Sequence, residues 1–165
     1  MTLRDDSGII PDNWTFAEAG EALSGPTILS LVDAVTRDLS GVAASDLGLH
    51  IDHDTETADL PTWFDKVSLI SVNFPNFANG RGFSIARRLR EQGFSGRLRA
   101  TGHLIADQYA YLRACGFDEV KVSEKLSNRQ PQAHWDAAAK SMTIGYQRGY
   151  SGVTNALDAR RATRT

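Results

Sequence analysis

The chain has 165 residues, of which 23% are charged and 41% belong to the hydrophobic set, as in ordinary globular proteins. This length suits one domain with a substantial core, and a net charge of -2 provides no basic field for nucleic acid. No apolar run reaches the length of a membrane span, about 18 residues, and the N-terminal sequence MTLRDDSG lacks the apolar core of a signal peptide. Cys115 is the single cysteine, so no internal disulfide can form. We therefore expect a cytoplasmic protein that binds neither nucleic acid nor membrane.

The first 25 residues are interpreted as an N-terminal cap segment. Ile9 and Ile10 suit a short strand, but residues 11–13 read Pro-Asp-Asn, which is a turn signal. Trp14 and Phe16 alternate, as in an edge strand or a cap over the core. The dipeptide at residues 25–26, Gly-Pro, then breaks the chain.

Between residues 27 and 39, apolar residues recur at helical spacing, which predicts a helix with Pro26 in its first turn and a stop at Gly41. The apolar stripe consists of Ile28, Leu31, Val32, Val35 and Leu39. An acidic loop at residues 52–56 and a short helix or irregular crossover at residues 58–64 come later.

Strand-like and helix-like patterns alternate through the rest of the chain. Strands are predicted over residues 46–51, 67–74, 97–101 and 118–122, and helices over residues 84–92, 104–114 and 132–147. Such alternation is typical of right-handed parallel βαβ units. The predicted fold class is therefore α/β, with about four parallel strands in an open three-layer sheet or in a half-barrel of (βα) units. A half-barrel would leave apolar surface that a second copy could cover, as in a homo-oligomer.

We predict one domain over residues 26–148. The arginines near the end of the chain indicate a loose basic tail over residues 149–165.

Arg81 lies between two glycines, after the strand at 67–74 and before a helix. Ligands of parallel α/β folds bind beyond the carboxyl ends of the strands. Gly80 and Gly82 permit close backbone approach, and the start of the helix offers free N–H groups. Arg81 adds a guanidinium fork that matches phosphate, sulfite or carboxylate, and Ser84 could cap the helix or bind the same anion. We hypothesise a small anionic ligand at residues 80–84; the alternative is a flexible loop with an ordinary N-cap.

Histidine and carboxylate side chains gather at residues 50–54, and His103 could approach from a later strand end. Such nitrogen and oxygen ligands suit zinc or iron, and they keep a metal-dependent hydrolase using His50, Asp52, His53 and His103 as a weaker alternative. No standard ligand spacing is present, so no metal ligand is assigned.

Several other residues have an ordinary structural interpretation. Asp107 and Gln108 fall in the first turn of a helix, where the dipole favours a carboxylate, although the pair could also face Arg81. Arg97 and Arg99 share one face of a strand, so we expect an ion pair there. Cys115 has no evident partner that would lower its pKa, and it is interpreted as a buried structural thiol.

Residues 72–87, VNFPNFANGRGFSIAR, resemble the domain of unknown function family 934, a bacterial family. The resemblance continues through residues 96–102, 107–108 and 112–118, and it covers about residues 47–150. It implies an oxidoreductase or accessory protein of assimilatory sulfite reduction, with sulfite reductase components as partners. The alternative is a non-catalytic binding or assembly partner of sulfite reductase. No residue set supplies a redox centre or a full nucleotide fingerprint, so the catalytic residues and the cofactor stay unassigned.

The resemblance includes several residues of the hypothesised site, because Arg81, Ser84, Arg87, Arg99, Asp107 and Gln108 match the family pattern. The expected anion-binding residues are Gly80, Arg81, Gly82, Ser84, Arg87 and Arg99, supported by Asp107, Gln108 and His103. Other members of the family usually have an aspartate at the positions of Asn73, Asn79 and His103.

Overall fold

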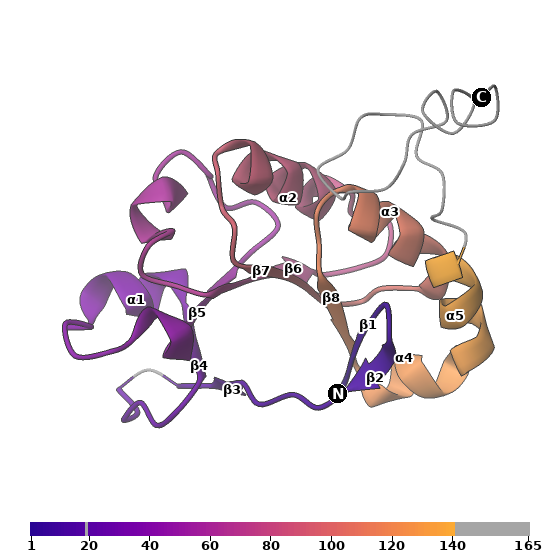
Figure 1. The fold of residues 1–165 in the computed structure, drawn as a ribbon, viewed down its shortest axis with the longest axis horizontal. Helices are drawn as coiled ribbons and strands as arrows, with labels where there is room; N and C mark the ends of the chain where they lie inside the picture. The colour runs from indigo at the N-terminus through magenta and orange to yellow at the C-terminus, as the bar shows by residue number, and fades with distance from the viewer. Residues whose placement is uncertain (19, 141–165) are drawn as a thin grey trace, which may run out of the picture.

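The computed structural model describes residues 1–18 and 20–140. The described residues form one eight-stranded sheet, in the order β2-β1-β8-β7-β6-β5-β4-β3, and five α-helices. Figure 1 shows that the sheet curls into an arc with α1, α2 and α3 on its convex side. The half-barrel alternative of the predicted α/β fold is therefore confirmed, whereas the prediction of about four strands was too low. The end of the helix predicted over residues 132–147 and the predicted tail lie outside the described residues.

The four predicted strands form the middle of the sheet. They are β5 (Leu47–Ile51), β6 (Leu69–Phe74), β7 (Arg97–Gly102) and β8 (Glu119–Val122), and each is parallel to the next. Helix α2 (Arg81–Glu91) connects β6 to β7 and covers the convex face with an apolar side. The alternation of strand and helix along the sequence thus corresponds to consecutive neighbours in the sheet.

The N-terminal part of the chain supplies the strands that were not predicted. β4 (Thr27–Ser30) and β3 (Thr15–Phe16) extend one edge in parallel. β1 (Thr2–Asp5) is antiparallel to β8 at the other edge, and β2 (Gly8–Ile10) is the outermost strand there. Residues from the predicted cap segment therefore lie at both edges of the half-barrel.

The helix predicted over residues 27–39 is wrong in its first part. Residues Thr27–Ser30 form β4, with their two apolar side chains fully buried, and α1 covers only Leu31–Thr36. Val32 and Val35, which belonged to the predicted apolar stripe, are 76% and 67% exposed. The predicted stripe combined residues of a buried strand with residues on the exposed side of a short helix, and these happened to fall at helical spacing.

The remaining helices are short. They are η1 (Ala44–Asp46), η2 (Leu60–Trp63), η3 (Ala106–Gln108), α3 (Tyr109–Ala114), α4 (Glu124–Arg129) and α5 (Gln132–Lys140). None of the helices in residues 1–18 and 20–140 is long and apolar enough to cross a membrane.

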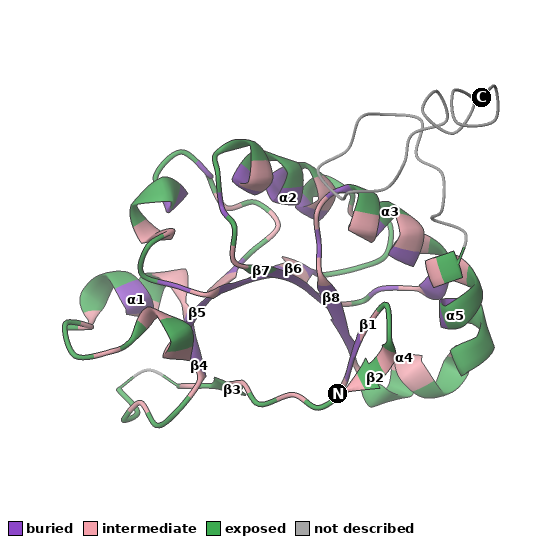
Figure 2. Cartoon of the chain, in the orientation of Figure 1, coloured by how far each residue is buried: buried purple, intermediate pink, exposed green. Residues whose placement is uncertain are grey.

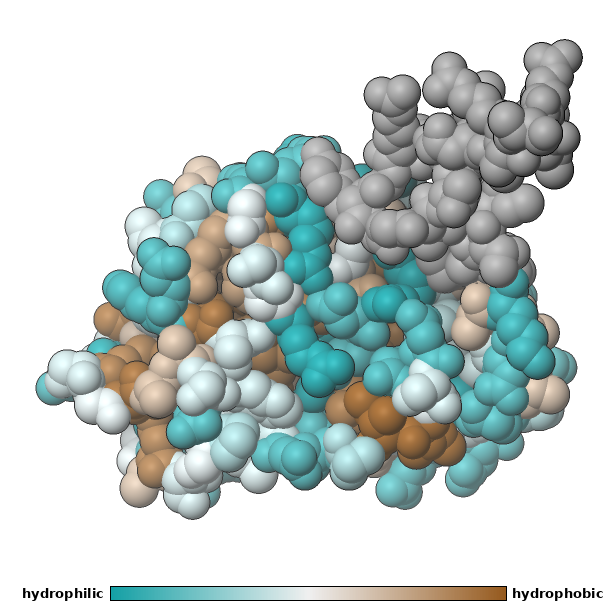
Figure 3. Space-filling model, viewed as in Figure 1, coloured by the Kyte–Doolittle hydropathy of each residue, from teal (hydrophilic) through white to brown (hydrophobic). Residues whose placement is uncertain are grey.

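The two faces of the sheet differ in chemistry. On the convex face, apolar side chains pack against the helices, and Figure 2 colours the central strands as buried. These side chains are Leu49, Ile51, Ile70, Val72, Phe74, Leu98, Ala100, Val120 and Val122. Since side chains alternate between the faces of a strand, their neighbours point into the arc. Figure 3 shows that side chains fill the arc, with hydrophilic residues across its middle.

Candidate functional site

A polar row crosses the concave face on five parallel strands. The register pairs Ser30 with His50, His50 with Ser71, Ser71 with Arg99, and Arg99 with Glu119. Residues that lie opposite each other in neighbouring strands share one face of the sheet. Ser71, Arg99 and Glu119 are no more than 1% exposed. Because buried polar groups are costly unless they are hydrogen-bonded, this row must find its partners inside the half-barrel.

One half of the row is a chain of hydroxyl groups that ends at a histidine. His50 Nδ1 lies 3.2 Å from Ser71 Oγ, which lies 2.8 Å from Thr101 Oγ1. The ring of Phe16 packs edge-on against the imidazole, with 5.1 Å between the centroids. Burial lowers the pKa of His50 below its ordinary value, and the nearby charge of Asp52 opposes this only in part. The imidazole is therefore neutral at pH 7, with one ring nitrogen able to donate and the other to accept.

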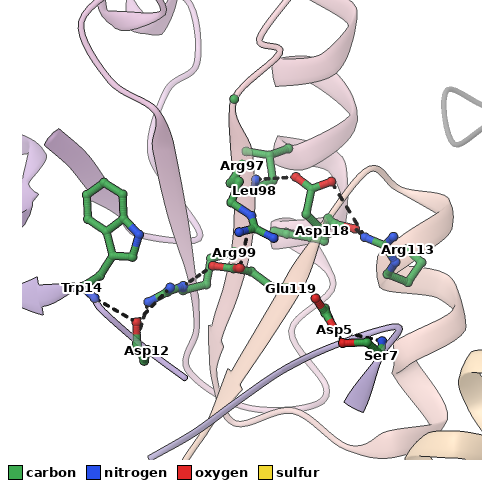
Figure 4. A network of polar contacts seen from close by, with 12 residues as sticks. Asp5, Ser7, Asp12, Trp14, Arg97, Leu98, Arg99, Arg113, Asp118 and Glu119 are labelled. Carbon is green, nitrogen blue, oxygen red and sulfur yellow. Dashed lines mark hydrogen bonds and ion pairs between the residues drawn. The ribbon is translucent and has the colours of Figure 1, made fainter. Parts of the chain in front are cut away.

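The other half of the row is a network of charges, drawn in Figure 4. Arg99 Nε donates to Glu119 Oε1 over 2.7 Å, and its two Nη groups donate to the oxygens of Asp12 over 3.1 and 3.3 Å. Lys121 Nζ lies 2.6 Å from Asp12 Oδ2, and Arg97 Nε lies 3.4 Å from Glu119 Oε2. Arg97 and Arg99 thus each form an ion pair with Glu119, which confirms the ion pair predicted for this strand face.

Burial by itself would raise the pKa of the Asp12 carboxyl. The hydrogen bond from Lys121 and the charge of Arg99 outweigh burial, and the pKa of Asp12 falls below its usual value. Asp12 is therefore ionised at neutral pH. Asp12 is thus a carboxylate held between two cations, Arg99 and Lys121.

Asp12 belongs to residues 11–14, which we call the strap. The strap runs from β2 to β3 across the open side of the arc, as Figure 1 shows. Trp14 packs beside Gly48, where an added Cβ would lie 3.2 Å from the indole ring and 3.1 Å from the side chain of Ile28. The missing side chain at Gly48 therefore makes room for Trp14. Sequence reasoning missed Asp12, because its partner Arg99 is 87 residues away in the chain.

The predicted anion loop lies at the start of α2, on the convex side. Gly80 is the N-cap residue and has no side chain that could cap the helix. The Arg81 N–H donates to Asn79 Oδ1 over 3.1 Å. Arg81 and Ser84 are exposed. The first turn contains no acidic residue, so the cationic Arg81 lies at the positive end of the helix, where an anion is favoured.

Gly82 has a different role from the one that the sequence suggested. It is buried, and an added Cβ would lie 2.4 Å from the ring of Phe74 on β6. The glycine is therefore required for the contact of α2 with the sheet.

The structure separates the other two predicted arginines from the start of the helix. The spacing of three residues places Arg81, Ser84 and Arg87 along one side of α2. Arg87 is nevertheless farther along, with its guanidinium carbon 5.8 Å from the centroid of the Tyr111 ring. Arg99 lies on the concave face, on the other side of the sheet from α2.

The supporting residues lie near the same edge as the loop. Gln108 Nε2 donates to the carbonyl oxygen of Phe77 over 2.8 Å and so ties the loop after β6 to η3. The ring of His103 lies 6.4 Å from that of Phe77. Asp107 is exposed, and no hydrogen bond or ion pair within the described ranges joins it to Arg81.

The described part of the chain places no group of three or more His, Cys, Asp or Glu residues where it could hold a metal ion. His50 faces Ser71, whereas Asp52 accepts a hydrogen bond from Asn73 Nδ2 over 3.0 Å. The metal-hydrolase alternative therefore finds no support in this arrangement. Cys115 is buried, as predicted.

A family model described as bacterial protein of unknown function (DUF934) matches residues 48–156. The chain belongs to this family. The matched region contains α2 and most of the polar row, but the strap and strands β1 to β4 lie before it. Searches of the curated proteins and of the solved structures each find no match. Membership of the family confirms the resemblance that residues 72–87 carry.

Proposed function

We propose that the protein acts in assimilatory sulfite reduction and binds a small oxyanion at the start of α2. Its role there is that of an oxidoreductase component or of a non-catalytic partner of sulfite reductase. Membership of the family supports the link to sulfite reduction, through the resemblance described above. The observation that carries the anion site is Arg81 in a first turn without any acidic residue.

An oxyanion suits this position for electrostatic reasons. The positive end of a helix favours a negative charge by about 0.3–1 kcal/mol, so Arg81 stands where its own charge is unfavourable. A bound oxyanion would reverse the sign of that interaction and accept hydrogen bonds from the guanidinium fork and from Ser84. Space for it exists at Gly80, because the nearest atom to an added Cβ is 3.9 Å away.

Asn79 also favours an anion at this loop. Its Oδ1 accepts the Arg81 N–H without adding a negative charge. An aspartate, which the resemblance implies for other members at this position, would accept the same bond and repel the ligand. We infer that the asparagine makes the loop of this chain the stronger anion site.

The reduction of sulfite requires electrons, which this chain is poorly equipped to carry by thiol chemistry. Cys115 is the single cysteine, and its side chain is buried. One cysteine provides neither a dithiol pair nor the ligands of an iron–sulfur cluster. An electron-carrying partner or cofactor is therefore part of the proposal.

Calorimetric titration of the full chain with sulfite and with sulfate tests the anion site. We expect saturable binding that Arg81→Ala weakens by about tenfold or more, since a hydrogen bond to a charged group contributes about 1.5–3 kcal/mol. The matched control is Arg88→Ala, which removes the same charge from the last turn of the same helix. An equal loss in the two variants, or no binding by the wild type, contradicts the site.

The biological part is tested in a deletion strain grown on sulfate or on cysteine. We expect growth to fail on sulfate alone. Normal growth on sulfate contradicts a role in sulfite reduction, whatever the titration shows.

A further inference from the structure

We propose that Arg99 and Lys121 form a second oxyanion site, on the concave face, which Asp12 of the strap occupies and from which a small ligand can displace it. The ligand class is a small molecule with a tetrahedral oxyanion or a pair of carboxylates. This inference does not rest on the proposed function, because the site lies on the opposite side of the sheet from α2.

Two cations converge on a single carboxylate. The Arg99 fork reaches both oxygens of Asp12, and Lys121 Nζ reaches Oδ2 from β8. The side chain of Arg99 is 1% exposed and that of Lys121 is 11% exposed. A planar fork beside a point charge is the arrangement that proteins use to bind carboxylates and phosphates. The oxygens of Asp12 therefore stand where those of a ligand would bind.

The charge of Lys121 depends on Asp12 for its partner. Arg97 and Arg99 share the carboxylate of Glu119, and Arg97 also lies near the charge of Asp5. Within the described ranges, Asp12 is the only carboxylate at ion-pair distance from Lys121. If Asp12 leaves, Lys121 and the two Nη groups of Arg99 lose the carboxylate that they share. A dianion would place two negative charges against these two cations.

The strap is held by side chains. Among the described residues, main-chain hydrogen bonding to the sheet resumes only at Thr15, whose N–H donates to the Pro26 carbonyl over 3.1 Å. Residues 11–14 are anchored by the two ion pairs of Asp12 and by Trp14 beside Gly48. Displacement of Asp12 therefore frees the strap, and Trp14 reports the event.

Fluorine NMR of the full chain labelled with 5-fluorotryptophan provides the test. The chain has three tryptophans, and Trp14→Phe assigns the strap signal. The probes are sodium sulfate and sodium malonate, with sodium chloride at equal ionic strength as the control. We expect sulfate or malonate to shift the Trp14 signal saturably while those of Trp63 and Trp135 stay in place. The more potent probe distinguishes a tetrahedral oxyanion from a dicarboxylate.

Three variants sharpen the test. Asp12→Asn keeps the shape of the strap and removes the internal competitor, so we expect anion affinity to rise by about tenfold or more. Lys121→Met should abolish the shift of the Trp14 signal. Asp59→Asn is the matched control, because its exposed side chain makes no capping bond.

A Trp14 signal that no probe moves in the wild-type protein overturns the proposal. A folded Asp12→Asn protein that binds anions no more tightly than Asp59→Asn also overturns it. Should Asp12→Asn fail to fold, the wild-type titration and Lys121→Met still decide the question.

Discussion

Arg99 and Glu119 lie opposite each other on β7 and β8, and their ion pair is almost completely shielded from water. We predict that Glu119→Ala lowers the free energy of unfolding by about 3–5 kcal/mol, because it leaves Arg99 buried with half of its partners missing. Urea unfolding followed by circular dichroism measures the change.

Replacing both members of the pair is the informative comparison. Arg99→Met combined with Glu119→Leu removes the charges together, and we expect a smaller loss than from Glu119→Ala alone. Asp12 then still has Lys121 as its partner. A double variant less stable than the single one would contradict this account of the pair.

Gly82→Ala tests whether the glycine serves packing. The new methyl group would lie 2.4 Å from the Phe74 ring, and overpacking of this kind costs about 1–3 kcal/mol. Gly80→Ala is the control, since it has open space and an ordinary backbone conformation. Gly82→Ala should therefore have a clearly lower melting temperature than Gly80→Ala. Equal melting temperatures would mean that α2 shifts freely on β6.

The stability of the protein should depend on pH through His50. Its folded-state pKa is lowered by burial, so as the pH falls the unfolded chain, with a pKa of about 6.5, takes up the proton first. Stability is therefore complete above about pH 6.5 and declines as the pH falls from there towards the folded-state pKa.

Urea midpoints at about pH 7.5 and about pH 5.5 measure this effect. His50→Gln should flatten the dependence, whereas His134→Gln, which replaces an exposed histidine, should keep the wild-type slope. A slope unchanged by His50→Gln would contradict the prediction.

Arg81→Glu should have opposite effects on stability and on binding. A carboxylate in the first turn of α2 interacts favourably with the helix dipole, so we expect a gain of about 0.3–1 kcal/mol in the absence of anions. Added sulfate should raise the melting temperature of the wild type more than that of the variant, which keeps only the concave site. If sulfate stabilises the variant as much as the wild type, the anion does not bind at Arg81.

The elements that the sequence predicts well are those with local signals. The apolar run of β6 and the amphipathic pattern of α2 can each be recognised within about a dozen consecutive residues. The segment from Thr27 failed because periodicity cannot tell a buried strand followed by a short helix from one longer helix. Only the sheet shows that the first half of that segment pairs with β5.

The concave site is less predictable, because its members come together through tertiary structure alone. Arg99 could be expected to form an ion pair, since a charge on an interior strand needs a partner. That the partners are Glu119 and Asp12 depends on the curl of the sheet and on the path of the strap. A Pro-Asp-Asn sequence indicates a turn and contains no signal for a distant arginine.

The pairing of β1 with β8 has a consequence for synthesis of the chain. Thr2 pairs with Val122, so the first strand of this sheet in chain order waits for β8, the last strand of the described sheet. Contacts this distant in sequence form slowly, since the entropy of closing the loop opposes them. The nascent protein therefore exposes the unpaired β1–β2 hairpin, with Ile9 on it, until β8 is made. Within this sheet, the edge strands that are synthesised first are therefore the last to find their place.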